Sequence, residues 1–70
     1  MVWERSGDTY YASPLGPNDE PLFHMIIEQL PDGMWDWTVW PPGGDPSQAM
    51  RGVALSVQDA MNEAEKSIAP

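Results

Sequence analysis

The sequence contains no cysteine and a single histidine, His24. Without cysteine neither a disulfide nor a thiolate metal site can form, and one histidine cannot build a histidine-rich zinc site. Domains shorter than about 80 residues usually rely on a disulfide, a metal or a partner subunit for stability. This chain of 70 residues must therefore either form an unusually good core or gain stability from another chain.

Basic residues are also scarce, because three of them stand against eleven acidic residues and leave a formal net charge of −8. Arg5, Arg51 and Lys66 are far apart in the sequence, whereas a nucleic-acid binder normally carries a basic patch. We therefore expect no direct binding to DNA or RNA, since phosphate would be repelled at long range. The acidity is typical of a well-solvated surface. The alternative is a protein that imitates nucleic-acid charge or docks on a basic partner.

Long hydrophobic runs are absent as well. No run is longer than that of residues 25–27, which is far too short to cross a membrane. Residues 1–5 lack the basic region and the following apolar run of a signal peptide. We therefore expect a cytoplasmic protein that does not enter a membrane and forms one small domain over residues 1–70.

Prolines and glycines are plentiful by contrast, with eight and six respectively, and they divide the chain into blocks. Residues 2–5 and 9–12 flank Ser6-Gly7-Asp8, which predicts a hairpin with a glycine-containing turn. Residues 13–21 are predicted to form a loop, because each of their three prolines lacks a backbone donor and restrains the residue before it. Residues 41–46, with the sequence PPGGDP, predict a second loop.

The strongest pattern is a hairpin of residues 22–30 and 34–40 around Pro31-Asp32-Gly33. Proline, aspartate and glycine in this order suit a type I turn followed by a left-handed residue, which closes a three-residue loop. This loop places Leu30 opposite Met34 and so fixes the register of the other pairs. Strand side chains alternate between faces. One face then holds seven side chains, six of them apolar: Phe23, Met25, Ile27, Gln29, Trp35, Trp37 and Val39.

The last block predicts a short strand over residues 48–55, beside the second strand of the hairpin, and then a helix. Ser56 is the predicted N-cap, Asp59 completes an acidic variant of the capping box, and Leu55 is placed to pack on Ala60 as a hydrophobic staple. Helical spacing groups an apolar stripe of Val57, Ala60, Met61, Ala64 and Ile68. The predicted fold is therefore α+β: a three- to five-stranded antiparallel meander with the C-terminal helix packed on one face.

The opposite face of the hairpin is unusually apolar for a solvated sheet face. It holds Leu22, His24, Ile26, Glu28, Leu30, Met34, Asp36, Thr38 and Trp40. One helix cannot cover both faces of a sheet, so three explanations stay open. Trp3, Tyr10, Tyr11 or the proline-rich loop folds over this face, a second copy of the chain packs on it, or a different protein does.

We expect a second copy, because a homodimer would also support the small core. The predicted interface uses that face or an exposed strand edge, and its residues are Leu22, His24, Ile26, Met34 and Trp40. The expected function is a non-enzymatic protein-interaction or structural module without a small-molecule substrate. The alternative is an acidic inhibitor or nucleic-acid mimic that binds a basic protein surface.

No pattern predicts a catalytic, cofactor or metal site. Glu28 and Asp36 face each other in the predicted register, and paired carboxylates can act as acid and base. A flat sheet face offers them no cleft, so we interpret them as solvated acids or as acceptors for a basic side chain of a neighbouring chain. His24 lies about 13 Å along the strand from Glu28, too far to share a metal with the pair, and its expected neighbour is Trp40.

Three segments within residues 34–69 share one pattern: Trp35-x-Trp37-x-Val39, Gly52-x-Ala54-x-Ser56 and Ala60-Met61-x-x-Ala64-Glu65. This half of the chain resembles small bacterial domains of no established activity, in which a strand hairpin runs into a capped, alanine-rich helix. The resemblance implies a bacterial origin and carries no mechanism to this chain.

Overall fold

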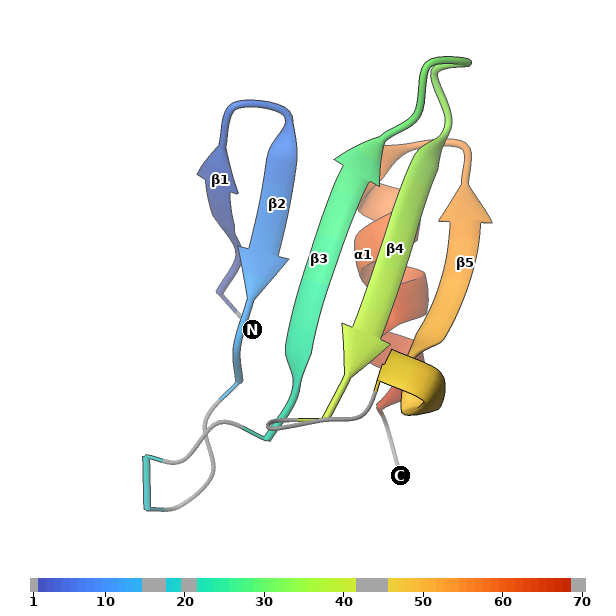
Figure 1. Ribbon diagram of the computed structural model, residues 1–70. Helices are drawn as coiled ribbons and strands as arrows, with labels where there is room; N and C mark the ends of the chain where they lie inside the picture. Colours follow the sequence, from blue (N-terminus) through green and yellow to red (C-terminus); the bar gives the residue numbers. More distant parts are fainter. Residues whose placement is uncertain (1, 15–17, 20–21, 42–45, 69–70) are drawn as a thin grey trace.

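The computed structural model describes residues 2–14, 18–19, 22–41 and 46–68 (Figure 1). Its elements, in order, are β1 (Glu4–Ser6), β2 (Thr9–Ala12), β3 (His24–Gln29), β4 (Trp35–Trp40), η1 (Pro46–Gln48), β5 (Met50–Ala54) and α1 (Val57–Ser67). The five strands form one antiparallel sheet in the order β1-β2-β3-β4-β5. This confirms the predicted α+β meander with a C-terminal helix. No helix in the described residues is long and apolar enough to span a membrane.

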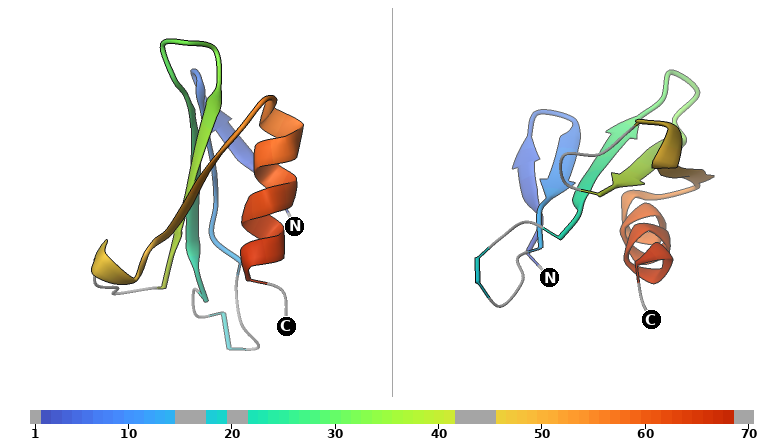
Figure 2. Two further views of the ribbon diagram at one scale, coloured as in Figure 1. Left: turned by 90° about the vertical axis from the view of Figure 1, so that its right-hand side faces the viewer. Right: turned by 60° about the horizontal axis from the view of Figure 1, so that its bottom comes forward.

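The helix and the sheet form two layers, with α1 lying behind β3, β4 and β5 (Figures 1 and 2). Between the layers, Met25, Ile27 and Val39 are fully buried, and Trp37 is nearly so. Ala60 and Ala64 contribute the buried side of the helix. The face predicted to carry the core is therefore the face that the helix covers.

The β3–β4 hairpin has the predicted register in every pair from His24–Trp40 to Gln29–Trp35. Its loop closes with a hydrogen bond of 2.7 Å from the Leu30 N–H to the Met34 carbonyl. Gly33 has φ +90°, a conformation that glycine adopts without steric cost. The Asp32 carboxylate accepts the Met34 N–H at 2.9 Å, which further fixes the turn.

The N-terminal hairpin is present with a shorter first strand than predicted. Ser6 pairs with Thr9, so the turn consists of Gly7 and Asp8, and Gly7 has φ +62°. Of the two predicted loops, residues 15–17, 20–21 and 42–45 lie outside the described residues. The last residue of the second predicted loop, Pro46, is the first residue of η1, a position in the first turn of a helix where proline is tolerated. β5 begins two residues later than predicted.

The helix begins as predicted, since the Ser56 hydroxyl accepts the Asp59 N–H at 3.1 Å. The predicted hydrophobic staple is wrong, because Leu55 remains 79% exposed. Leu55 follows Val53 by two residues, and Val53 pairs with Asp36 on the face away from the helix. Strand alternation therefore directs Leu55 away from Ala60.

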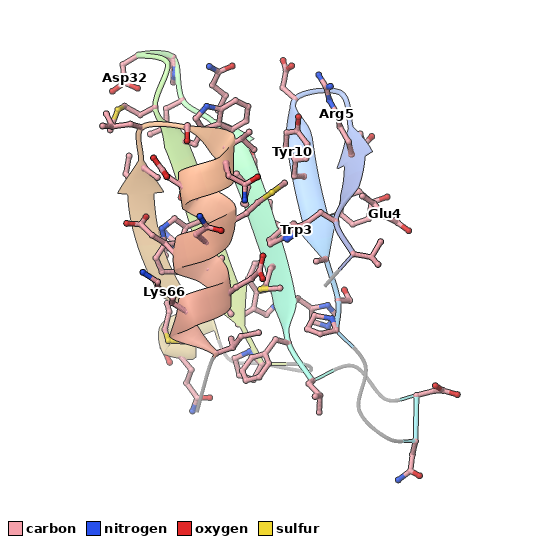
Figure 3. The ribbon with its side chains drawn as sticks, turned by 180° about the vertical axis from the view of Figure 1, so that it is seen from behind. Trp3, Glu4, Arg5, Tyr10, Asp32 and Lys66 are labelled. Carbon is pink, nitrogen blue, oxygen red and sulfur yellow. The ribbon has the colours of Figure 1, made fainter. Side chains whose placement is uncertain are left out.

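Two N-terminal aromatic residues, Trp3 and Tyr10, lie on the helix side of the sheet (Figure 3). The Trp3 indole donates to the Glu65 carboxylate at 3.2 Å, and Tyr10 packs edge-on against Trp35 with ring centroids 5.9 Å apart. The hypothesis that Trp3 or Tyr10 covers the second face is therefore wrong. Trp3 and Tyr10 pack against the buried core instead. Tyr11 pairs with Ile26 and therefore lies on the opposite face.

Candidate interaction surface

The face opposite the helix looks toward the viewer in Figure 1, and we call it the open face. The strand registers assign to it Glu4, Ser6, Thr9, Tyr11, His24, Ile26, Glu28, Asp36, Thr38, Trp40, Arg51 and Val53. Among the described elements, η1 lies on this side, just before the first residue of β5 (Figure 2). No helix or strand in the described part of the chain crosses the centre of the face.

Three of the predicted interface residues form one cluster on the open face. His24 and Trp40 are cross-strand partners, and their ring centroids lie 6.1 Å apart at an angle of 38°. Ile26 lies two residues further along β3, and all three are half-buried. The Ser13 hydroxyl lies 3.2 Å from His24 Nδ1, so a hydrogen bond orients the imidazole beside the indole.

The other two predicted residues lie toward opposite ends of β3 and β4. Leu22 precedes β3 by two residues and is 44% exposed, which extends the cluster at the His24 end. Met34 follows the hairpin loop at the far end, roughly 20 Å away at the usual strand rise. It lines a groove beside Val53 and Leu55, so the structure places it apart from the other four.

The predicted interface left out residues on the outer strands, of which Tyr11 was named only as a side chain that could fold over this face. Tyr11 stands beside Ile26 and is 39% exposed, and Arg51 and Val53 continue the open face across β5. The sequence carries a signal for Arg51 and Val53, because they alternate with the small residues Gly52 and Ala54. Small residues suit the side of the strand on which the helix packs, which leaves Arg51 and Val53 on the other side.

Acidic side chains lie among these apolar residues. Glu28 and Asp36 are cross-strand partners, as predicted, and Glu4 pairs with Tyr11 at the β1 edge. A hydrogen bond to Glu4 raises the pKa of Tyr11 above 10.0, and the Glu4 charge and desolvation of the phenol act in the same direction. Arg51 brings a positive charge to the β5 edge of the same face.

The described residues form shallow hollows at two places on the surface. A groove of about 370 Å³ runs from the C-terminal end of β5 toward α1. A hollow of about 230 Å³ lies beside Val2, Glu4, Tyr11, Ala12 and Ser13. The groove is lined by Met34, Val53, Ala54, Leu55, Asp59, Asn62, Glu63 and Lys66. Within the described ranges, no three histidine, aspartate or glutamate side chains gather closely enough to hold a metal ion.

Comparison with models of protein families, with curated proteins and with solved structures gives no match. The chemistry of the open face and of the sheet edges is therefore what a functional proposal must rest on.

Proposed function

We propose that this protein is a cytoplasmic, non-enzymatic interaction module that self-associates through the open face of its sheet. The observation that carries the proposal is the cluster of Tyr11, His24, Ile26 and Trp40 on a face whose centre no described element covers. Exposure of such an apolar patch to water is unfavourable, and apolar patches on the surfaces of small proteins commonly mark protein contacts. Packing on a second copy would bury it.

A second copy fits because the open face has opposite charges at its two edges. One row of partners crosses all five strands: Glu4, Tyr11, Ile26, Thr38 and Arg51. Glu4 begins this row on β1 and Arg51 ends it on β5. Strands lie about 4.8 Å apart, which separates the two charges by about 19 Å and places Ile26 midway between them.

Two-fold symmetry makes this row complementary to itself. An axis parallel to the strands, running above β3, places β1 of each copy opposite β5 of the other. Glu4 then faces Arg51 of the second copy at both edges, while the two Ile26 side chains meet at the centre. An isologous contact of this kind requires a self-complementary surface, and the row provides one.

The same symmetry brings the two copies of Glu28 toward each other, because Glu28 also lies on the central strand. Like charges that face each other destabilise a contact. Replacing Glu28 by glutamine should therefore strengthen the association, whereas an interface that leaves Glu28 at its rim would respond little.

The test is absolute mass by light scattering over a range of protein concentrations, with circular dichroism to confirm that each variant is folded. Trp40→Glu should shift the equilibrium to monomer, because it places a charge in the apolar cluster. Leu55→Glu is the matched control, since Leu55 is 79% exposed and lies outside the cluster. A Trp40→Glu variant with the wild-type mass would refute the assignment.

Charge exchange tests the symmetry itself. Glu4→Arg and Arg51→Glu should each weaken the dimer, and the double variant should restore it, because the pair is only reversed. Failure of the double variant to recover, with both singles weakened, would show that these residues contact something other than each other.

An acidic inhibitor of a basic protein is the second candidate, and the paired Glu28 and Asp36 on the open face favour it together with the net charge of −8. Salt separates the two proposals, since attraction between net opposite charges is screened at high ionic strength. Self-association should persist in high salt because its centre is apolar, whereas a complex held by these acids should dissociate.

A further inference from the structure

The two edges of the sheet differ in how well they are protected against further strand pairing. β1 consists of three exposed residues, two of them the charged Glu4 and Arg5. β5 has five residues without proline, and no described strand lies beyond it. Short strands and charged side chains discourage edge pairing, so β5, which is longer than β1 and has Arg51 as its one charged residue, is the edge that is more open to it.

The hairpin fixes which backbone groups of β4 point toward β5. The Leu30 N–H bonds to the Met34 carbonyl, and hydrogen-bonded pairs alternate along an antiparallel ladder. Asp36, two residues after Met34, therefore directs its backbone groups toward β3. Trp37 directs its own toward β5.

The alternation continues into β5. Gly52 is the partner of Trp37, so its N–H and carbonyl bond inward to β4. The backbone groups of Arg51 and Val53, on either side, point away from the sheet. These two residues offer the donors and acceptors that an added strand would use.

The side chains beside this edge differ on its two faces. Val53 and Leu55 are 51% and 79% exposed and belong to the face away from the helix. On the helix side, the groove along β5 is flanked by Asp59 and Glu63, with Lys66 at the opposite end of the same stripe. An added strand would therefore meet the apolar Val53 and Leu55 on one face, with Arg51 two residues before Val53, and on the other face a pair of acids followed by one lysine.

The geometry points to β5 as the docking site for an extended segment of another protein in which apolar residues alternate with lysine or arginine. Its apolar side chains would lie beside Val53 and Leu55, and its basic ones beside Asp59 and Glu63. Main-chain bonds to an edge give such complexes their affinity, and alternate side chains give their specificity. The net charge of −8 favours the approach of a basic segment. Val53 also belongs to the open face, but the backbone edge of β5 and the helix residues Asp59 and Glu63 do not, so strand addition goes beyond the proposed self-association.

The test uses a short synthetic peptide that alternates valine and lysine, with binding followed by fluorescence anisotropy. A peptide of the same composition with its valines and lysines in blocks controls for unspecific charge attraction. Val53→Pro removes an outward N–H while leaving the inward ladder intact, because proline is tolerated at an outward position of an edge strand. Val53→Thr keeps the N–H and serves as the matched control.

We expect the alternating peptide to bind more tightly than the block peptide and to lose about tenfold in affinity with Val53→Pro, the loss of one main-chain bond and its neighbours. Val53→Thr should retain binding. Asp59→Asn should weaken binding about threefold, the effect of one exposed ion pair.

Equal binding of the alternating and the block peptide, or undiminished binding to Val53→Pro, would overturn strand addition. Equal binding of a peptide that alternates valine and glutamate would overturn the choice of a basic partner. If no peptide binds, and the mass of the protein falls with Val53→Pro but not with Val53→Thr, the edge joins two copies of this chain instead. Trp40→Glu, which changes the open face alone, keeps this outcome distinguishable from failure of the proposed function.

Discussion

Adding one methyl group at Gly52 should destabilise this domain, although the same change in most strands has the opposite effect. Gly52 pairs with Trp37 across β4 and β5. A Cβ at this position would lie 2.5 Å from the indole atoms Cε2 and Nε1 and 2.6 Å from Cζ2. The indole therefore occupies the space that any other residue would fill, and it must move if alanine takes that place.

The sign of the effect follows from three magnitudes. Alanine in a strand is about 0.5–1 kcal/mol better than glycine where there is room for it. Overpacking a core costs about 1–3 kcal/mol, and a turned indole would also lose its 2.9 Å hydrogen bond to Glu63, worth about 1 kcal/mol. We therefore expect a net loss of about 1–3 kcal/mol, against a total stability of about 4–10 kcal/mol for a chain of this length.

Urea unfolding followed by far-ultraviolet circular dichroism measures this loss as a lower midpoint at an unchanged slope. Trp37→Phe removes the indole atoms that meet the new methyl group, so Gly52→Ala should be neutral or stabilising in that background. Gly33→Ala is the control, because it meets no atom within 4 Å and destabilises through its φ of +90° whichever residue stands at position 37. A stabilising Gly52→Ala, or equal losses in both backgrounds, would refute the reasoning.

Three other changes test single contacts. Ser56→Ala should cost about 1 kcal/mol in urea unfolding because the helix loses its N-cap, and Ser56→Asp should retain most of the stability. Trp3→Phe should cost about 1 kcal/mol through the lost hydrogen bond to Glu65, and hydrogen exchange should show it as faster opening of the N-terminal hairpin. Glu4→Gln should lower the pKa of Tyr11 toward 10.0 in an NMR titration. Since the raised pKa means that the folded state holds this proton more tightly, the wild type should lose stability as pH rises above about 10, and the variant less so.

The parts of the fold that the sequence predicts correctly depend on local chemistry. Pro31-Asp32-Gly33 admits one loop geometry, and that loop sets the β3–β4 register, the burial of Met25 and Ile27, and the contact of His24 with Trp40. The start of α1 depends on equally local chemistry, because the Ser56 hydroxyl accepts the N–H of Asp59, only three residues later. These features required no knowledge of distant residues.

The features that the sequence could not supply join segments that are far apart in the sequence. Trp3 and Glu65 are 62 positions apart, and nothing local indicates that the N-terminal hairpin would turn its indole toward α1. Tyr11 and Arg51 reach the open face across residues 13–23 and 41–49, whose lengths do not fix a strand register. The candidate surface was therefore predicted at its centre, around His24 and Trp40, and missed at its edges.

Three of the four tryptophans lie on the helix side of the sheet, and the fourth lies on the open face. Trp35 and Trp37 pack under α1, and Trp3 joins them at the margin of the core. Two of these indoles donate to helix carboxylates, which ties the N-terminal segment and the sheet to α1 without a disulfide. Trp40 instead stands on the open face. Because the other three already account for the attachment of the helix, we expect replacing Trp40 to change the proposed association and leave the fold intact, whereas truncation of the side chain in Trp37→Ala should unfold the domain.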